Sequence, residues 1–242
     1  FDPQKRVLCS CHAVPGTWVQ EASIFTSGAT LRWFRDQVGQ AESILAKEKG
    51  QDPYELMTSQ AEESPMGANG LVLIPHLVGA GAPHWNPHAK GLLFGLALGH
   101  QRKDIYRAVL EGVAFEIRKN LEVFKEIGIE PKELKLTGGG SRSDFWNQIY
   151  ADVLGITCVR NVIEEATSLG AAILAASGAG LFPDISKAAE NLCKVDKKWV
   201  PNENHSEFYE KMYNFSYQLY NFLENNNLYK KLNDLIQNKN ME

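Results

Sequence analysis

The segment Leu134-Lys135-Leu136-Thr137-Gly138-Gly139-Gly140-Ser141-Arg142-Ser143 joins a predicted β-strand to a predicted helix. The three successive glycines allow a sharp turn, and they leave no Cβ in the path of an approaching ligand. The helix predicted from about Asp144 to Leu154 points its first N–H groups at this turn, and such groups attract anions. The segment therefore indicates either a nucleotide site or a tight strand-to-helix turn with no ligand.

Two common phosphate-binding motifs do not match this turn. A P-loop requires Gly-Lys-Ser/Thr after the glycines, and that sequence is absent. A dinucleotide fingerprint requires a final glycine where Ser143 stands, and no acidic residue follows on a second strand at the required distance. An oxidoreductase domain is therefore disfavoured. Ser143 can instead cap the helix or donate its hydroxyl to a ligand.

Outward from the turn, β-prone runs alternate with amphipathic helical patterns, which predicts an α/β fold with a mixed sheet covered by helices on both faces. Residues 40–65 are polar and mostly helical in propensity, and residues 225–242 are predicted to fray as a polar tail. The predicted strands are residues 7–10, 17–20, 71–74, 92–98, 133–136 and 156–160. The predicted helices are residues 23–38, 104–128, 144–154, 167–177, 184–192 and 206–223.

Composition excludes several classes of protein. The 242 residues are 44% hydrophobic with a formal net charge of -4, which rules out a disordered chain. Because 25 Lys and Arg face 29 Asp and Glu, we expect no nucleic-acid partner, and no apolar run is long enough for a membrane partner. The four scattered cysteines predict free thiols in a reducing compartment, hence a cytoplasmic protein.

No metal site is expected from the spacing of the potential ligands. His84 and His88 are four residues apart, but Pro87 between them argues against a helical metal pair, so both are interpreted as loop hydrogen-bonding residues. Glu164 and Glu165 precede the small-residue helix at 167–177. There their charge complements the helix dipole, which is favoured over a catalytic pair.

Four ordered blocks resemble the FGGY family of carbohydrate kinases, and the resemblance extends over about residues 6–225. The most specific block, Gly91–Glu111, fits the second sequence pattern of the family, including Gly95, Asp104, Ala108 and Glu111. The other blocks are Glu21–Asp36, the loop Gly79–Gly91, and the region from Thr137 through Ala172. The segment His12–Gly16 resembles xylulokinase-type members, although the loop resembles glycerol kinases nearly as well.

The resemblance implies an actin-like (ribonuclease H-like) fold, with residues 1–242 as the C-terminal nucleotide-binding domain of a two-domain sugar kinase. It implies ATP with Mg²⁺ as cofactors, and it implies no metal-ligating residue within this chain. By family position, the residues that line the ATP site are Gly28, Arg32, Gly138, Gly139, Gly140 and Ser143. Ser143 stands where some members have Asn, and position 32 varies among relatives.

The resemblance also implies that much of the site lies outside this sequence. The catalytic Asp of the family, the phosphate loop of the N-terminal domain and most sugar contacts precede Phe1 in the family order. We therefore expect a fragment that supplies no catalytic residue and is inactive alone. Its expected partners are ATP or ADP, a small sugar, the N-terminal domain and a second copy in a homodimer.

Three functions stay open at this stage. A kinase of a xylulose-like ketopentose is favoured, and a kinase of glycerol, another polyol or a sugar acid is the alternative within the family. The alternative from another class is a non-enzymatic actin-like module that binds nucleotide. A Gly-Asp motif upstream of Phe1 would favour the kinase over the module.

Overall fold

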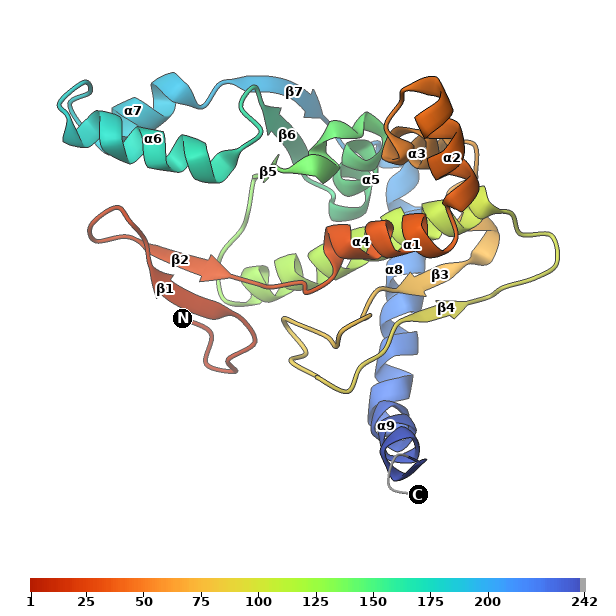
Figure 1. Ribbon diagram of the computed structural model, residues 1–242. Helices are drawn as coiled ribbons and strands as arrows, with labels where there is room; N and C mark the ends of the chain where they lie inside the picture. Colours follow the sequence, from red (N-terminus) through yellow and green to blue (C-terminus); the bar gives the residue numbers. More distant parts are fainter. Residues whose placement is uncertain (240–242) are drawn as a thin grey trace.

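A computed structural model describes residues 1–239 of the chain (Figure 1). The strands are β1 Leu8–Cys11, β2 Trp18–Glu21, β3 Val72–Ile74, β4 Leu92–Phe94, β5 Glu133–Leu136, β6 Thr157–Asn161 and β7 Val195–Trp199. The helices are α1 Ser27–Gln37, α2 Gln40–Lys49, α3 Pro53–Glu62, α4 Arg102–Glu126, α5 Asp144–Leu154, α6 Ala166–Gly178, α7 Ile185–Leu192, α8 Glu203–Asn225 and α9 Leu228–Lys239. Two 3₁₀ turns, η1 Ala68–Gly70 and η2 Gly139–Arg142, complete the set.

The predicted mixed sheet is present as β5-β6-β7, in which β5 pairs parallel and β7 antiparallel with β6. The other strands form two separate antiparallel hairpins, β1-β2 and β3-β4, rather than extending this sheet. Helix α4 contacts β3 on one side and α5 on the other, so the β3-β4 hairpin packs against a helix and not beside β5. Strand β7 was not predicted, because its sequence, VDKKW, has no apolar alternation.

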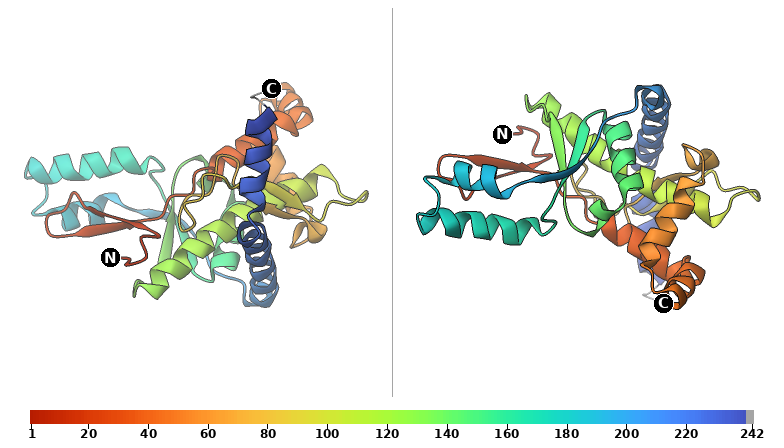
Figure 2. Two further views of the ribbon diagram at one scale, coloured as in Figure 1. Left: turned by 90° about the horizontal axis from the view of Figure 1, so that it is seen from below. Right: turned by 90° about the horizontal axis from the view of Figure 1, so that it is seen from above.

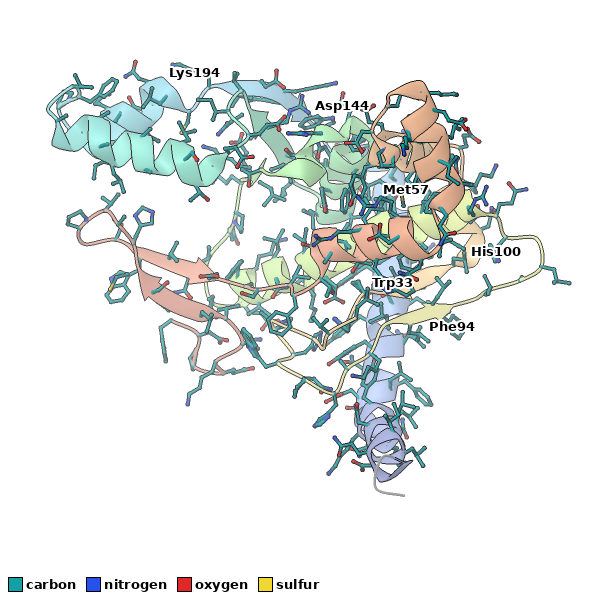
Figure 3. The ribbon with its side chains drawn as sticks, in the orientation of Figure 1. Trp33, Met57, Phe94, His100, Asp144 and Lys194 are labelled. Carbon is teal, nitrogen blue, oxygen red and sulfur yellow. The ribbon has the colours of Figure 1, made fainter. Side chains whose placement is uncertain are left out.

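Helix α4 is the centre of the molecule. It contacts α1, α3, α5, α8 and β3, and every residue from 106 to 115 is buried. Gly112 permits the contact with β3, because a Cβ at this position would lie 2.4 Å from the carbonyl oxygen of Leu73. Met57 of α3, labelled in Figure 3, belongs to this packed core and is 0% exposed. The core therefore holds α1, α3 and α5 around one shared helix.

Helices α6 and α7 and the β1-β2 hairpin project from the same side of the molecule (Figures 1 and 2). Three buried residues, Leu169, Ile173 and Ala188, form the small core between α6 and α7. All four residues of β1 are exposed. This projecting part, residues 8–21 and 166–192, is called the lobe below.

The C-terminal region differs from the expectation of a frayed tail after residue 225. Residues 228–239 form helix α9, and residues 240–242 lie outside the described part of the chain. Tyr229 is 5% exposed and its ring centroid lies 5.9 Å from that of Tyr220 on α8, so the tail is held by aromatic packing. Within residues 1–239, no helix combines the length and the apolar character needed to cross a membrane.

Candidate nucleotide site

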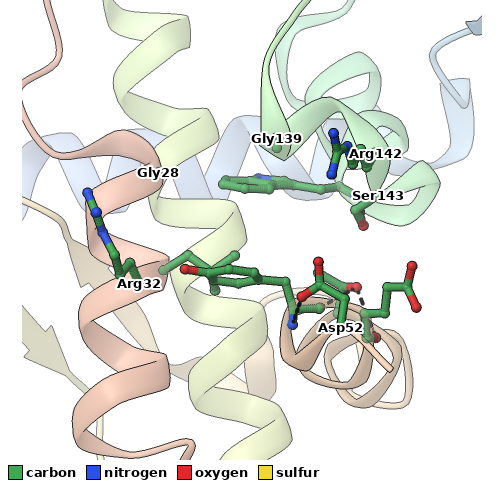
Figure 4. A pocket seen from close by; sticks show the side chains of 12 residues that line it. Gly28, Arg32, Asp52, Gly139, Arg142 and Ser143 are labelled. Atoms are coloured by element: carbon green, nitrogen blue, oxygen red, sulfur yellow. Dashed lines mark hydrogen bonds between the residues drawn. The ribbon is translucent and has the colours of Figure 1, made fainter. Parts of the chain in front are cut away.

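A cavity of about 560 Å³ opens between α1, α3 and the glycine turn. Figure 4 shows Gly28 and Arg32 of α1 on one wall, with Gly139, Arg142 and Ser143 on the opposite wall. The floor comes from α3 and its N-cap. The cavity is lined by Gly28, Leu31, Arg32, Asp52, Tyr54, Glu55, Thr58, Gly139, Gly140, Arg142, Ser143 and Trp146.

Five of the six residues predicted for the ATP site line this cavity together. Gly28 and Arg32 are more than 100 positions from Gly139, Gly140 and Ser143, yet they share its walls. The sixth, Gly138, is not among the lining residues. It starts the turn with φ 75° and ψ -176°, a conformation that favours glycine, and thereby directs the chain into η2.

The glycine turn leaves open space on its cavity side. A Cβ placed on Gly139 would meet no atom within 4 Å. A Cβ on Gly140 would lie 3.2 Å from the ring of Trp146, so this position is already in contact with the cavity wall. The turn is therefore not packed shut, and Gly139 leaves room for a flat or charged group to approach the backbone.

The wall behind the turn is rigid. Ser143 accepts a hydrogen bond from the backbone N–H of Trp146 at 3.2 Å, so it is the N-cap of α5 as the sequence suggested. Its hydroxyl hydrogen can still be donated to a ligand. Trp146 is 3% exposed, donates its Nε1–H to the carbonyl oxygen of Leu110 at 3.1 Å and stacks on Tyr150 with ring centroids 5.3 Å apart.

Helix α1 forms the opposite wall. Leu31 is 5% exposed and anchors the helix in the core, while Arg32 is exposed. A Cβ on Gly28 would meet nothing within 4 Å, so the first turn of α1 has a bare surface. No acidic residue lies in that turn, which leaves the positive end of the helix dipole uncompensated. Both features suit the approach of an anionic ligand.

No motif in the sequence indicates that α3 lines the site. Asp52 caps α3 by accepting a hydrogen bond from the N–H of Tyr54 at 2.8 Å, and Pro53 occupies the first turn. Arg35 of α1 lies over the Tyr54 ring, with its Cζ 4.9 Å from the centroid. The Asp-Pro pair is a recognisable helix start, but only the folded chain brings it to the cavity.

The cavity carries both signs of charge. Arg142 donates from Nε to Glu164 at 2.8 Å, and this pairing, with a smaller contribution from Asp52, raises the pKa of Arg142. Arg32 adds a second cation, while Asp52 and Glu55 contribute carboxylates. No group of three or more His, Cys, Asp or Glu side chains suited to holding a metal ion occurs in residues 1–239.

Comparison with known proteins identifies the family. The family profile described as "FGGY family of carbohydrate kinases, C-terminal domain" matches residues 3–179. The chain belongs to the FGGY family of carbohydrate kinases. The earlier resemblance is thereby confirmed.

The relatives of this FGGY chain include kinases of different substrates. It is 32% identical over 209 residues to a xylulose kinase of Staphylococcus epidermidis, covering 86% of this chain and 40% of the relative. It is 37% identical over 183 residues to a glycerol kinase of Saccharolobus islandicus, covering 75% of this chain and 34% of the relative. The chain therefore spans well under half the length of these relatives.

The solved structures confirm the actin-like fold. A ligand-bound xylulose kinase of Lactobacillus acidophilus superposes with a TM-score of 0.79 at 26% identity, covering 92% of this chain and 43% of that one. The expected α/β, actin-like architecture of FGGY kinases is thus present here.

The FGGY signature residues hold the fold and do not line the cavity. Asp104 accepts hydrogen bonds from Ser64 Oγ at 2.6 Å and from Asn69 Nδ2 at 2.8 Å, and it is 1% exposed. Glu111 is equally buried and accepts from Arg107 Nε at 2.8 Å. A Cβ on Gly95 would lie 2.3 Å from the carbonyl oxygen of Gly70. Asp104 and Glu111 thus fix α4, which in turn positions the cavity walls.

Proposed function

We propose that this chain is the nucleotide-binding part of an ATP-dependent kinase that phosphorylates a hydroxyl of a sugar or polyol. One observation carries the proposal: Gly28 and Arg32 face Gly139 and Ser143 across a single open cavity. The cavity volume of about 560 Å³ lies in the usual range for small-molecule sites. Its bare glycine turn and the uncompensated N-terminus of α1 suit a nucleotide with anionic phosphates.

ATP fits the residues that are present, and it would supply the γ-phosphoryl group. Gly139 leaves the space that a ribose or base needs, and Arg32 offers charge to the phosphates. Mg²⁺ would enter on the phosphate oxygens, since this ion keeps several waters and often binds few protein ligands. The chain's own contribution is to orient the nucleotide. The base that accepts the hydroxyl proton is proposed to lie in an N-terminal domain of the same protein.

For the substrate we favour a xylulose-like ketopentose. The support is the similarity to xylulose kinases in both sequence and structure. Glycerol or another polyol is the second candidate, because glycerol kinases are at least as similar in sequence. A panel of ketopentoses, glycerol and sugar acids, with ADP release measured on the full-length protein, separates the two. Phosphorylation of none of them would favour the non-enzymatic module.

We further propose that the isolated chain is inactive, that it works in the cytoplasm and that its principal protein partner is the N-terminal domain. The four cysteines are free, in keeping with a reducing compartment. A homodimer is the second proposed association. Turnover of any sugar by the purified 242-residue chain would contradict the first of these proposals.

The nucleotide site is tested by Gly139→Val. Its φ is not positive and a Cβ there meets nothing, so the fold accommodates the substitution while the side chain fills the cavity. We expect ADP affinity to fall about tenfold or more, measured by isothermal titration calorimetry. Gly99→Val is the matched control, because this glycine also has open space and lies outside the cavity. Equal ADP affinity in all three proteins would remove the turn from the site.

A further inference from the structure

The two ends of the cavity differ in charge. At one end lies the first turn of α1, with the bare Gly28 and no acidic residue. At the other lies α3, where Asp52 and Glu55 face the cavity beneath Arg142 and Ser143 (Figure 4). Carboxylates repel phosphates, so a bound nucleotide directs its phosphates towards α1 and its base towards Asp52.

One carboxylate oxygen of Asp52 is fixed by a hydrogen bond, and in the described part of the chain the other is free. Its Oδ1 accepts the N–H of Tyr54 at 2.8 Å, which fixes the side chain at the start of α3. Within residues 1–239, its Oδ2 takes part in no hydrogen bond. An ionised carboxylate only accepts hydrogen bonds, so this oxygen selects for a donor on the ligand.

Arg142 supplies the complementary group. Its Nε is occupied by Glu164 at 2.8 Å, and this bond orients the guanidinium plane. Its two terminal nitrogens make no hydrogen bond to the described part of the chain, and the nearby charge of Asp52 attracts them. The α3 end of the cavity thus presents an acceptor on Asp52 and, across from it, donors on Arg142.

We propose that Asp52 and Arg142 select adenine over 6-oxopurines by contacting the edge of the base at its 6-position. Asp52 Oδ2 accepts from the N6 amino group of adenine, and a terminal N–H of Arg142 donates to N1. Hypoxanthine carries a carbonyl oxygen at position 6, and this oxygen faces the carboxylate without a proton between them. The inference rests on the proposed nucleotide site and adds to it the residues that choose the base.

Asp52→Asn tests this selection without removing the helix cap. Asn is as good an N-cap as Asp, so its Oδ1 still accepts the Tyr54 N–H while its amide group turns the free acceptor into a donor. Binding of ADP and of IDP to the whole 242-residue chain is measured by calorimetry. We expect the parent to prefer ADP about tenfold and the variant to bind both within about twofold. Glu62→Gln, the same charge change on an exposed residue of α3 outside the cavity, should keep the parental ratio.

The outcomes separate this inference from the function on which it rests. An unchanged preference for ADP in Asp52→Asn overturns the inference and leaves the nucleotide site intact. An equal loss of both nucleotides also overturns it, because Asp52 would then support the site without reading the base. If the parent binds neither nucleotide, the proposed site itself fails. Circular dichroism of each variant checks that α3 is retained.

Discussion

The region around α4 and the lobe differ in how completely their side chains are covered. Around α4, even charged residues such as Arg107 and Glu111 are buried and hydrogen-bonded to one another. In the lobe, α6 has no charged residue, yet only Leu169 and Ile173 of its 13 residues are buried. The cavity is built on the first region, through α1, α3 and α5. Rigid packing therefore supports the residues that line the cavity, while the lobe, with few buried side chains, is expected to add little to the stability of the chain.

The largest expected contrast comes from removing one carboxylate in each region. Glu111→Ala leaves Arg107 buried without its charge partner and removes the acceptor for the N–H of Gly67. We expect a loss of about 3–5 kcal/mol in the free energy of unfolding. In the lobe, Glu190 pairs with Lys187 at 2.7 Å and both are exposed, so Glu190→Ala should change it by less than about 0.5 kcal/mol.

Urea unfolding followed by circular dichroism measures both variants. Glu111→Gln separates charge from shape, since it keeps an acceptor for Gly67 while losing the ionic partner of Arg107. Similar small effects of the two alanine variants would show that the buried pair does not hold the α4 region together.

Much of this contrast could be predicted from the sequence, because it lies in local patterns. The apolar repeat of α4 and the glycine turn each determine their own conformation over a few residues. Strand β7 could not be predicted in this way. Its central residues, Lys197 and Lys198, are exposed, and the strand exists because it pairs with β6 and buries Trp199.

A second contrast concerns pH. Near the middle of α4, burial raises the pKa of Glu116 to about 8, and burial lowers the pKa of the neighbouring His76 to about 4. The Nε2 of His76 lies 3.6 Å from Glu116 Oε1, and Lys119 and His84 also face this cluster. Glu190 of the lobe has no such environment, because it is exposed.

The direction of the pH dependence of stability follows from the pKa changes of Glu116 and His76. The raised pKa of Glu116 gives stability that is present below its ordinary value of 4.5 and is lost as pH rises towards 8. The lowered pKa of His76 gives stability that is present above 6.5 and is lost as pH falls towards 4. Glu116→Gln should therefore gain on the order of 4 kcal/mol relative to the parent between pH 5 and 8.5. Urea unfolding at several pH values measures this, with Glu190→Gln as the control for the same substitution on an exposed residue.

The candidate site contains residues that sequence motifs identify and residues that they do not. The family resemblance predicts that Gly28 and Gly139 lie at one site, because each belongs to a short motif in the family order, and both line the cavity. Asp52 carries no ligand motif, only the Asp-Pro signal of a helix start. Its place opposite Arg142 results from packing of α3 on α4, a contact between segments about 50 residues apart. Nothing local to Asp52 specifies that contact.

The smallest expected difference in stability comes from two helical glycines, one closely packed and one with open space around it. A Cβ on Gly112 of α4 would lie 2.4 Å from the carbonyl oxygen of Leu73, which is backbone and cannot rotate away. Gly112→Ala should therefore push α4 from β3 and cost about 1–3 kcal/mol. A Cβ on Gly170 of α6 meets nothing within 4 Å, so Gly170→Ala should stabilise α6 by about 0.5–1 kcal/mol through helix propensity alone.

Opposite signs for the same chemical change would locate the difference in packing rather than in the helices themselves. Hydrogen exchange of the α6 amides measures the gain in the lobe, where local opening does not require global unfolding. Urea unfolding measures the loss around α4. If Gly170→Ala slowed exchange in α4 as well as in α6, the lobe would be coupled to the core. The contrast between a self-sufficient core and a weakly attached lobe would then have to be abandoned.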